Sequence, residues 1–205
     1  MRTCFVLVVF CACAIVGSAQ VGELSISGGV SRFGDANLGT IADAITSPTI
    51  AINDGFRLGL RFTLNTYRFF GHEFGYAYNR SKIGLPAQTI PGQPTQPASE
   101  ISVPIHQGLY NFLAYATPEG SRVRPFATGG GGFSSFFPPG TSVYYGNQIT
   151  KFGYNYGGGL KARVTEVWGL RFDVRQYVTG QPFDFPNAEG RLTQTEVSAG
   201  ISFNF

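Results

Sequence analysis

Nine charged side chains stand at alternate positions within otherwise apolar or glycine-rich stretches, and they are the best candidates for a functional site. They comprise six cations and three anions, namely Arg57, Arg61, Glu73, Lys161, Arg163, Arg171, Asp173, Arg175 and Glu196. Charges of both signs on one enclosed face can neutralise one another in a hydrogen-bonded network, or they can line a path for ions. The set therefore leaves two functions open, an interior filled by ion pairs and a narrow or gated pore.

The two histidines, His72 and His106, are the only candidate general bases. A nucleophilic mechanism of the His–Ser type needs a serine near the base, but neither histidine has one two positions further along. Two histidines without a cysteine or a carboxylate cluster predict no metal site. The glycine runs 129–132 and 157–159 do not join a strand to a helix, as a phosphate loop does. We therefore expect no cofactor, and an enzyme is the least favoured alternative.

The alternation that spaces the charges predicts β-strands, because successive side chains of a strand point to opposite faces. In Phe56–Leu64 every even position is apolar, whereas the odd positions hold arginine, glycine or threonine. Such patterns predict eight strands, at Glu23–Phe33, Phe56–Leu64, Arg68–Asn79, Ile105–Tyr115, Arg124–Phe133, Lys151–Val164, Trp168–Tyr177 and Thr193–Phe205.

The connections between these strands alternate in length. Short breaks fall near Thr66, Glu119 and Glu166. Long connections cover 34–54, 81–103, 134–149 and 178–191. Short periplasmic turns that alternate with long external loops are typical of outer-membrane barrels. We predict an all-β, eight-stranded antiparallel up-and-down transmembrane β-barrel with both ends on the periplasmic side; a soluble secreted barrel or sandwich is the alternative.

The cost of charge in lipid decides which face of each strand points inward. A lysine or arginine that faces lipid costs about 2–4 kcal/mol near the membrane midplane. Arg171, Asp173 and Arg175 share one face of their strand, so that face is expected to line the lumen. The same argument places all nine charged groups inside, with a formal charge of +3. Since the interior of an eight-stranded barrel is just wide enough for side chains to fill, a charged plug is favoured over an open channel.

Hairpin geometry predicts two specific ion pairs. A turn centred on Tyr67 sets Arg61 opposite Glu73. A turn centred on Val167 or Trp168 sets Lys161 or Arg163, respectively, opposite Asp173.

The N-terminus has the pattern of a cleaved signal peptide. Arg2 supplies a positive charge, Phe5–Val16 is apolar, and Gly17–Ala19 supplies small residues for cleavage. We predict a signal peptide at 1–19 and a single barrel domain at 20–205. All three cysteines lie in the predicted signal, so no disulfide is expected in the barrel. The net charge of the whole chain, +3, gives no reason to expect a nucleic-acid partner.

Five segments carry a resemblance to a known family: Gly71–Tyr76, Arg124–Phe126, Phe152–Lys161, Trp168–Arg175 and Ser198–Phe205. They resemble the outer-membrane protein A-like eight-stranded β-barrels, the outer membrane protein β-barrel domain family. The resemblance implies insertion by the barrel assembly machinery with help from periplasmic chaperones. It also implies that Ile201, Phe203 and Phe205 form the C-terminal assembly signal.

These observations predict a protein of the bacterial outer membrane in contact with membrane lipid and lipopolysaccharide. The favoured role is structural or interactive, with four long external loops displayed on a charge-plugged barrel and a ligand at those loops. The alternatives are a narrow or gated pore through the ionic lumen and, less favoured, a lipid-modifying enzyme that uses His72 or His106.

Overall fold

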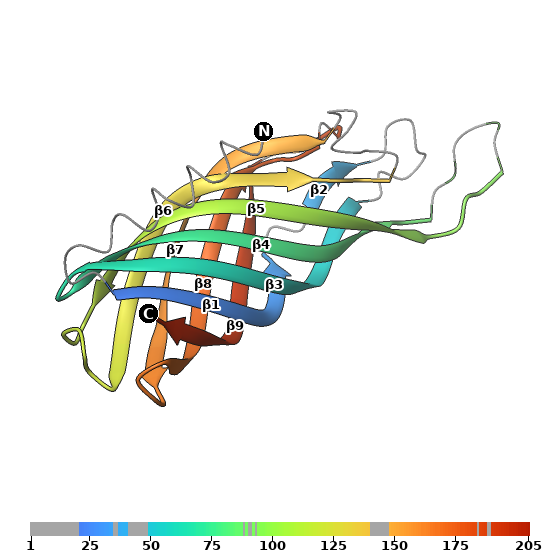
Figure 1. Cartoon of the computed structure of the whole chain (residues 1–205). Coiled ribbons are helices and arrows are strands. Elements are labelled where there is room, and N and C mark those ends of the chain that lie inside the picture. Colours follow the sequence, from blue (N-terminus) through green and yellow to red (C-terminus); the bar gives the residue numbers. More distant parts are fainter. Residues whose placement is uncertain are drawn as a thin grey trace, which may run out of the picture.

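The chain forms one antiparallel sheet that closes into a barrel (Figure 1). The computed structural model describes residues 21–34, 37–40, 49–87, 89, 92, 94–139, 148–183, 185–187 and 190–205. The strands are β1 (Val21–Phe33), β2 (Asn37–Thr40), β3 (Thr49–Tyr67), β4 (Phe70–Leu85), β5 (Ser99–Tyr115), β6 (Val123–Phe136), β7 (Ile149–Arg163), β8 (Trp168–Gly180) and β9 (Arg191–Asn204). No helix in the described residues is long and apolar enough to cross a membrane. The predicted signal peptide lies outside the described residues.

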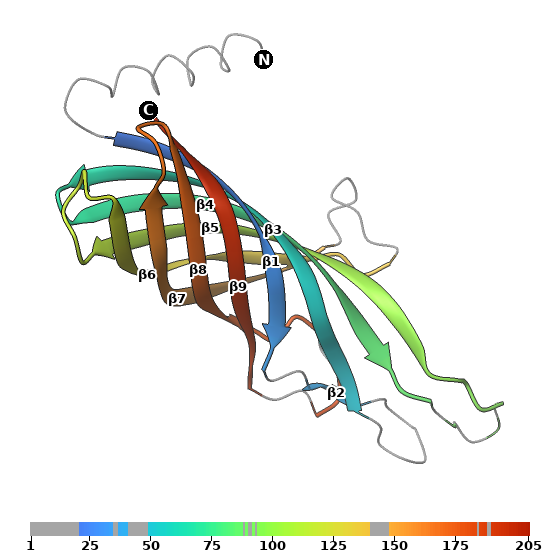
Figure 2. The same ribbon diagram turned by 90° about the horizontal axis from the view of Figure 1, so that it is seen from below.

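Closure depends on β1, which pairs with β9 on one side and with β3 on the other (Figure 2). The remaining long strands pair with their neighbours in sequence, as the up-and-down prediction requires. The short strand β2 is an addition to the eight predicted strands and pairs with the first residues of β3. The fold prediction is therefore confirmed, with one extra edge strand.

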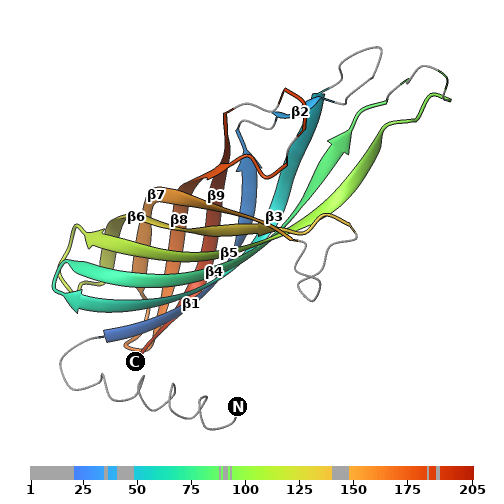
Figure 3. The ribbon, with the colours of Figure 1, turned by 90° about the horizontal axis from the view of Figure 1, so that it is seen from above.

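Strands β3, β4 and β5 are longer than predicted and extend beyond the rest of the barrel at the end that carries the long connections (Figure 3). The β4–β5 ladder continues to Leu85 and Ser99, whereas the β5–β6 ladder stops at Ile105 and Phe136. The predicted loops 34–54 and 81–103 were therefore too long. Pro104 does not end β5, because the β5–β6 ladder stops at Ile105 and a proline is tolerated where no ladder hydrogen bond needs its N–H. Its carbonyl oxygen still accepts from the backbone N–H of Phe137 at 2.9 Å.

The two faces of the wall differ as the alternation predicts. Large apolar side chains such as Ile26, Leu60 and Phe74 are exposed on the outer face. Serine, threonine, amide and charged side chains are buried inside. A soluble barrel would bury its apolar face, so this inverted distribution suits a wall surrounded by lipid.

Glycines on the inner face allow neighbouring strands and large side chains to approach closely. At Gly159 an added Cβ would lie 2.0 Å from the carbonyl oxygen of Phe172 and 2.7 Å from Cζ of Phe126. The Phe126 ring therefore occupies the space that a side chain at 159 would need. This contact explains part of the glycine run in β7 without a phosphate site.

Candidate functional site: an ion-pair network in the lumen

Two arginines of β8 form the centre of the lumen network. Arg171 Nη2 lies 2.5 Å from Glu73 Oε2, and Arg171 Nε lies 2.8 Å from Asp173 Oδ2. Arg175 contacts the same two carboxylates, at 2.8 Å from each. All four side chains are buried. Each carboxylate is thus shared by two guanidinium groups, an arrangement that offsets the cost of removing these charges from water.

Two further arginines from β3 join this centre to β9. Arg61 Nη2 lies 2.5 Å from Glu196 Oε1, and its guanidinium also approaches Asp173 at 3.6 Å. Arg57 Nε lies 2.9 Å from Glu196 Oε2, and Arg57 donates to Tyr177 Oη at 3.0 Å. The network therefore spans β3, β4, β8 and β9.

Glu23 is a member of the network that the sequence interpretation missed. Its Oε2 accepts a 2.7 Å hydrogen bond from Lys161 Nζ, which also donates to Tyr115 Oη at 3.1 Å. The signal was available, since Glu23 has the same parity as Ser25 and Ser27 on a strand whose other face is apolar. The sequence analysis began a strand at Glu23 but did not include this residue among the nine charged groups.

The predicted cross-strand pairs were wrong in register. Thr63, not Arg61, lies opposite Glu73, and Arg171, not Asp173, lies opposite Lys161. The β3–β4 ladder shifts between Asn65 and Tyr67, so the turn is not centred where simple counting puts it. An error of two residues keeps the same face inward, because side chains alternate with period two. Arg61 still approaches Glu73 diagonally, with its Nε 3.8 Å from Oε1.

A layer of buried amides separates the ion pairs from the long-connection end. Gln107 donates to Gln194 Oε1 at 3.1 Å and to Ser134 Oγ at 2.8 Å, and Asn79 donates to Gln107 Oε1 at 3.0 Å. Gln194 in turn donates to Ser31 Oγ at 2.8 Å. Hydrogen bonds thus cross the lumen from β5 to β9 and β1.

An apolar cluster fills the barrel beyond the amide layer. Its buried members come from β1 to β6, β9 and the β8–β9 connection: Phe33, Leu38, Ile50, Ile52, Ile83, Val103, Ile105, Phe136, Phe183 and Leu192. The ring of Phe183 packs edge-on against that of Phe136, with centroids 6.0 Å apart. We call this cluster the apolar cap.

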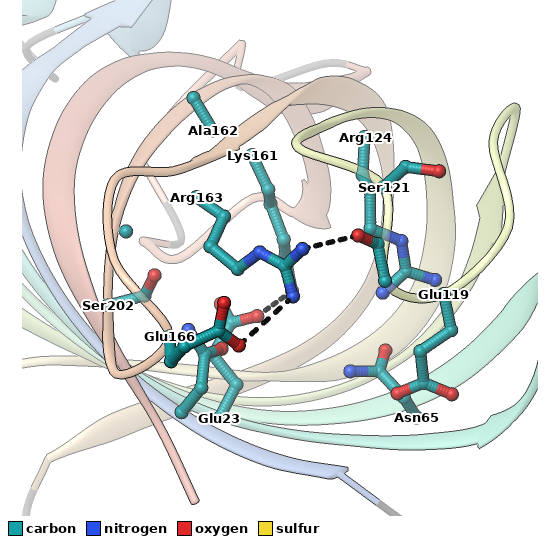
Figure 4. A pocket seen from close by; sticks show the side chains of 13 residues that line it. Glu23, Asn65, Glu119, Ser121, Arg124, Lys161, Ala162, Arg163, Glu166 and Ser202 are labelled. Atoms are coloured by element: carbon teal, nitrogen blue, oxygen red, sulfur yellow. Dashed lines mark hydrogen bonds and ion pairs between the residues drawn. The ribbon is translucent and has the colours of Figure 1, made fainter.

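The opposite end of the lumen opens into a cavity of about 230 Å³ (Figure 4). Its lining includes side chains from four strands and from the short turn between β5 and β6: Glu23, Asn65, Glu119, Arg124, Lys161 and Arg163. Arg163, predicted to lie in the charged lumen, is at this mouth, where it approaches Glu166 at 3.7 Å and donates to the carbonyl oxygen of Gly120. Partial burial raises the pKa of Glu119, and the nearby Arg124 opposes that rise. We call this cavity the vestibule.

Comparison with known proteins shows which family has this architecture. The model of the outer membrane protein beta-barrel domain family matches residues 3–205. The chain belongs to this family. Neisserial surface protein A has a similar fold, with a TM-score of 0.54 and 14% identity over 92% of this chain and 98% of that protein. The outer membrane protein OprG from Pseudomonas aeruginosa gives a TM-score of 0.51 and 13% identity over 90% and 96%. The comparison with curated protein sequences found no significant match.

The protein is thus a β-barrel of the bacterial outer membrane. In such barrels the short turns face the periplasm and the longer loops face outward. The vestibule accordingly opens to the periplasm, and the apolar cap lies at the external end. The extension of β3, β4 and β5 rises on the external side.

Both histidines lie on the outer wall of this outer-membrane barrel and contact tyrosines. His72 Nδ1 is 2.7 Å from Tyr110 Oη, and His106 Nδ1 is 2.6 Å from Tyr76 Oη. Ser135 lies opposite His106 on β6, but its hydroxyl pairs with that of Thr150. These contacts do not form the His–Ser arrangement of a hydrolase or acyltransferase. In the described part of the chain, no group of three or more side chains is placed to hold a metal ion.

Strand β9 and the residue that follows it present Ile201, Phe203 and Phe205 on the outer wall, where all three are exposed. Phe205 closes the barrel seam through paired backbone hydrogen bonds with Gly22, at 2.9 and 3.0 Å. Its ring stacks on that of Phe62, with centroids 6.2 Å apart. The terminal aromatic is therefore accessible from the membrane and also part of the β1–β9 junction.

Proposed function

We propose that this protein is a closed outer-membrane scaffold that holds an external β-hairpin for interaction at the cell surface. The observation that carries the proposal is the filled lumen. In the described residues, ion pairs, amides and the apolar cap occupy it at three successive levels. A pore would need a continuous polar path, and the apolar cap interrupts such a path at the external end.

The extended β4–β5 hairpin supports the interactive part of the proposal. Its ladder continues for six residue pairs past Ile105, with β3 alongside through the pairs of Ala51, Ile52 and Asn53. Lys82 and Glu100 cross-link the hairpin by a 2.7 Å ion pair. Apolar side chains on its inner face join the cap. The strand ends Leu85 and Ser99 therefore form a braced support, and a rigid support lowers the entropy lost when a partner binds.

Two measurements test this function. Planar-bilayer recording of the purified barrel is expected to show no steady conductance, both for the natural sequence and for Glu73→Ala. Steady conductance of the natural barrel would contradict the closed scaffold and support the narrow pore.

Adhesion tests the interactive role. Bacteria that carry the barrel with residues 86–98 replaced by a short turn are expected to bind cells or extracellular matrix less well than bacteria with the complete hairpin. Glu166→Ala, on the periplasmic side, is the control and is expected to leave adhesion unchanged. Equal adhesion of all three strains, at equal barrel levels, would contradict the proposal.

A further inference from the structure

Among the residues that the structure describes, the vestibule contains one cation that forms no ion pair. Lys161 is paired with Glu23, and Arg163 approaches Glu166. Arg124 differs from both, because its Nε and Nη2 atoms are buried and have no hydrogen-bond partner in the described part of the chain. The whole Arg124 residue is only 8% exposed. An unsatisfied guanidinium in such a place carries a desolvation cost that a bound acceptor would remove.

The ring of Tyr115 satisfies only one face of this guanidinium. Arg124 Cζ lies 3.7 Å from the ring centroid, which fixes the plane of the group by a cation–π contact. The ring lies below the plane of the guanidinium, whereas the N–H groups lie within that plane. The ring therefore accepts no hydrogen bond from them. Those donors form the planar fork that suits a carboxylate.

A second unsatisfied atom of opposite sign belongs to the same cavity. Glu119 Oε1 is buried, and none of the described residues hydrogen-bonds to it. Glu119 and Arg124 both line the vestibule (Figure 4), but they do not form an ion pair with one another. The cavity therefore offers a donor edge and an acceptor atom, each without a partner.

We propose that the vestibule binds a small zwitterion, a molecule that carries a carboxylate and an ammonium group, from the periplasm. The carboxylate accepts from Arg124, and the ammonium group donates to Glu119. The cavity of about 230 Å³ has room for such a molecule, since one water takes about 30 Å³ in the liquid. Ser121 and Asn204 also line the vestibule and supply further polar groups. This site is independent of the external hairpin and of whether the barrel conducts.

Three probes separate the two halves of the site: glycine carries both charges, acetate only the carboxylate, and methylammonium only the cation. Each is titrated into the complete protein in detergent, with chemical-shift changes of isotope-labelled protein as the readout. Glycine is expected to bind about tenfold more tightly than either single-charge probe, the usual effect of one additional charged hydrogen bond. Equal affinities for glycine and acetate, or no binding of glycine, would overturn the proposal.

Variants assign the roles within the site. Arg124→Gln is expected to weaken glycine and acetate binding about tenfold, whereas Glu119→Gln weakens glycine binding and leaves acetate binding unchanged or stronger. Arg122→Gln is the matched control, because Arg122 is exposed two residues from Arg124 and does not line the vestibule. If Arg124→Gln fails to fold, the glycine–acetate difference in Glu119→Gln still decides the matter. Unchanged glycine binding in Glu119→Gln, or an equal loss in Arg122→Gln, would overturn the site.

Discussion

Arg171 and Glu73 connect opposite walls of the barrel, with 2.5 Å between Nη2 and Oε2. Arg171 belongs to β8 and Glu73 to β4, strands separated by β5, β6 and β7 in the sheet. Backbone hydrogen bonds join only adjacent strands, so this ion pair acts across the lumen. It braces the barrel at a level where the backbone makes no such connection.

Removal of one member of this pair is expected to destabilise the barrel strongly. Glu73→Ala leaves Arg171 and Arg175 buried with one carboxylate fewer, and breaking a buried pair in this way costs about 3–5 kcal/mol. The measurement is the free energy of unfolding in denaturant, with the protein in lipid bilayers. Glu166→Ala is the control, because its side chain is 90% exposed and a surface pair contributes about 0–1 kcal/mol. A loss below about 1 kcal/mol in Glu73→Ala would show that the network does not stabilise the fold.

The outer wall is expected to penalise charge according to depth. Leu60 is the middle member of the outward apolar row of β3, so Leu60→Arg should cost about 2–4 kcal/mol of unfolding free energy. Tyr67 ends the same strand at the periplasmic turn, and Tyr67→Arg should cost about 0–1 kcal/mol. Both values come from denaturant titrations in the same bilayer. Equal costs at the two positions would contradict the placement of Leu60 near the midplane.

The close approach at Gly159 predicts a destabilising clash. Gly159→Ala places a Cβ 2.0 Å from the Phe172 carbonyl oxygen, so strand β8 or the Phe126 ring must move. Overpacking of this kind costs about 1–3 kcal/mol. Gly129→Ala is the matched control, because its Cβ meets nothing closer than 3.8 Å. Thermal unfolding of the two variants should separate them, and similar midpoints would argue against the clash.

The terminal aromatic is expected to affect assembly more than any other exposed aromatic. Phe205→Ala removes the residue that the family resemblance implies as the assembly signal, so we expect several-fold less barrel in the outer membrane. Phe152→Ala is the control, since Phe152 is 81% exposed on the same outer wall but far from the C-terminus in sequence. Quantification of the folded protein in outer-membrane fractions gives the comparison. Equal levels of the two variants would remove the special role of Phe205.

The sequence could predict which face of a strand each side chain occupies, but not which residue lies opposite it on the neighbouring strand. Arg171, Asp173 and Arg175 were assigned to the lumen from alternation and the cost of charge in lipid, and the structure buries all three. The partners depend on register, which the shift between Asn65 and Tyr67 and the geometry of the β7–β8 turn determine. There Thr165 Oγ1 accepts hydrogen bonds from the backbone of Val167 and Trp168. Counting residues from a presumed turn centre cannot include such local bonding.

The sequence pattern also did not predict the full lengths of β3, β4 and β5. Prolines and polar residues in 81–103 indicated a loop, but the inner faces of these strands pack into the apolar cap. That cap forms from segments far apart along the chain, and only their meeting stabilises the extension. The vestibule also depends on the tertiary structure. Nothing in the sequence distinguishes Arg124 and Glu119 from other charged residues, and only the fold buries atoms of both without hydrogen-bond partners among the described residues.

The sequence by itself determined the barrel class and the inward face of each strand. Period-two alternation is a local property, and charge is costly only on the strand face that meets lipid. The tertiary structure decided which charges meet. Arginine side chains are long enough to cross the lumen, so Arg171 finds Glu73 on a strand that is not its neighbour in sequence or in the sheet. Such contacts are set by closure of the wall as a whole, which no single strand encodes.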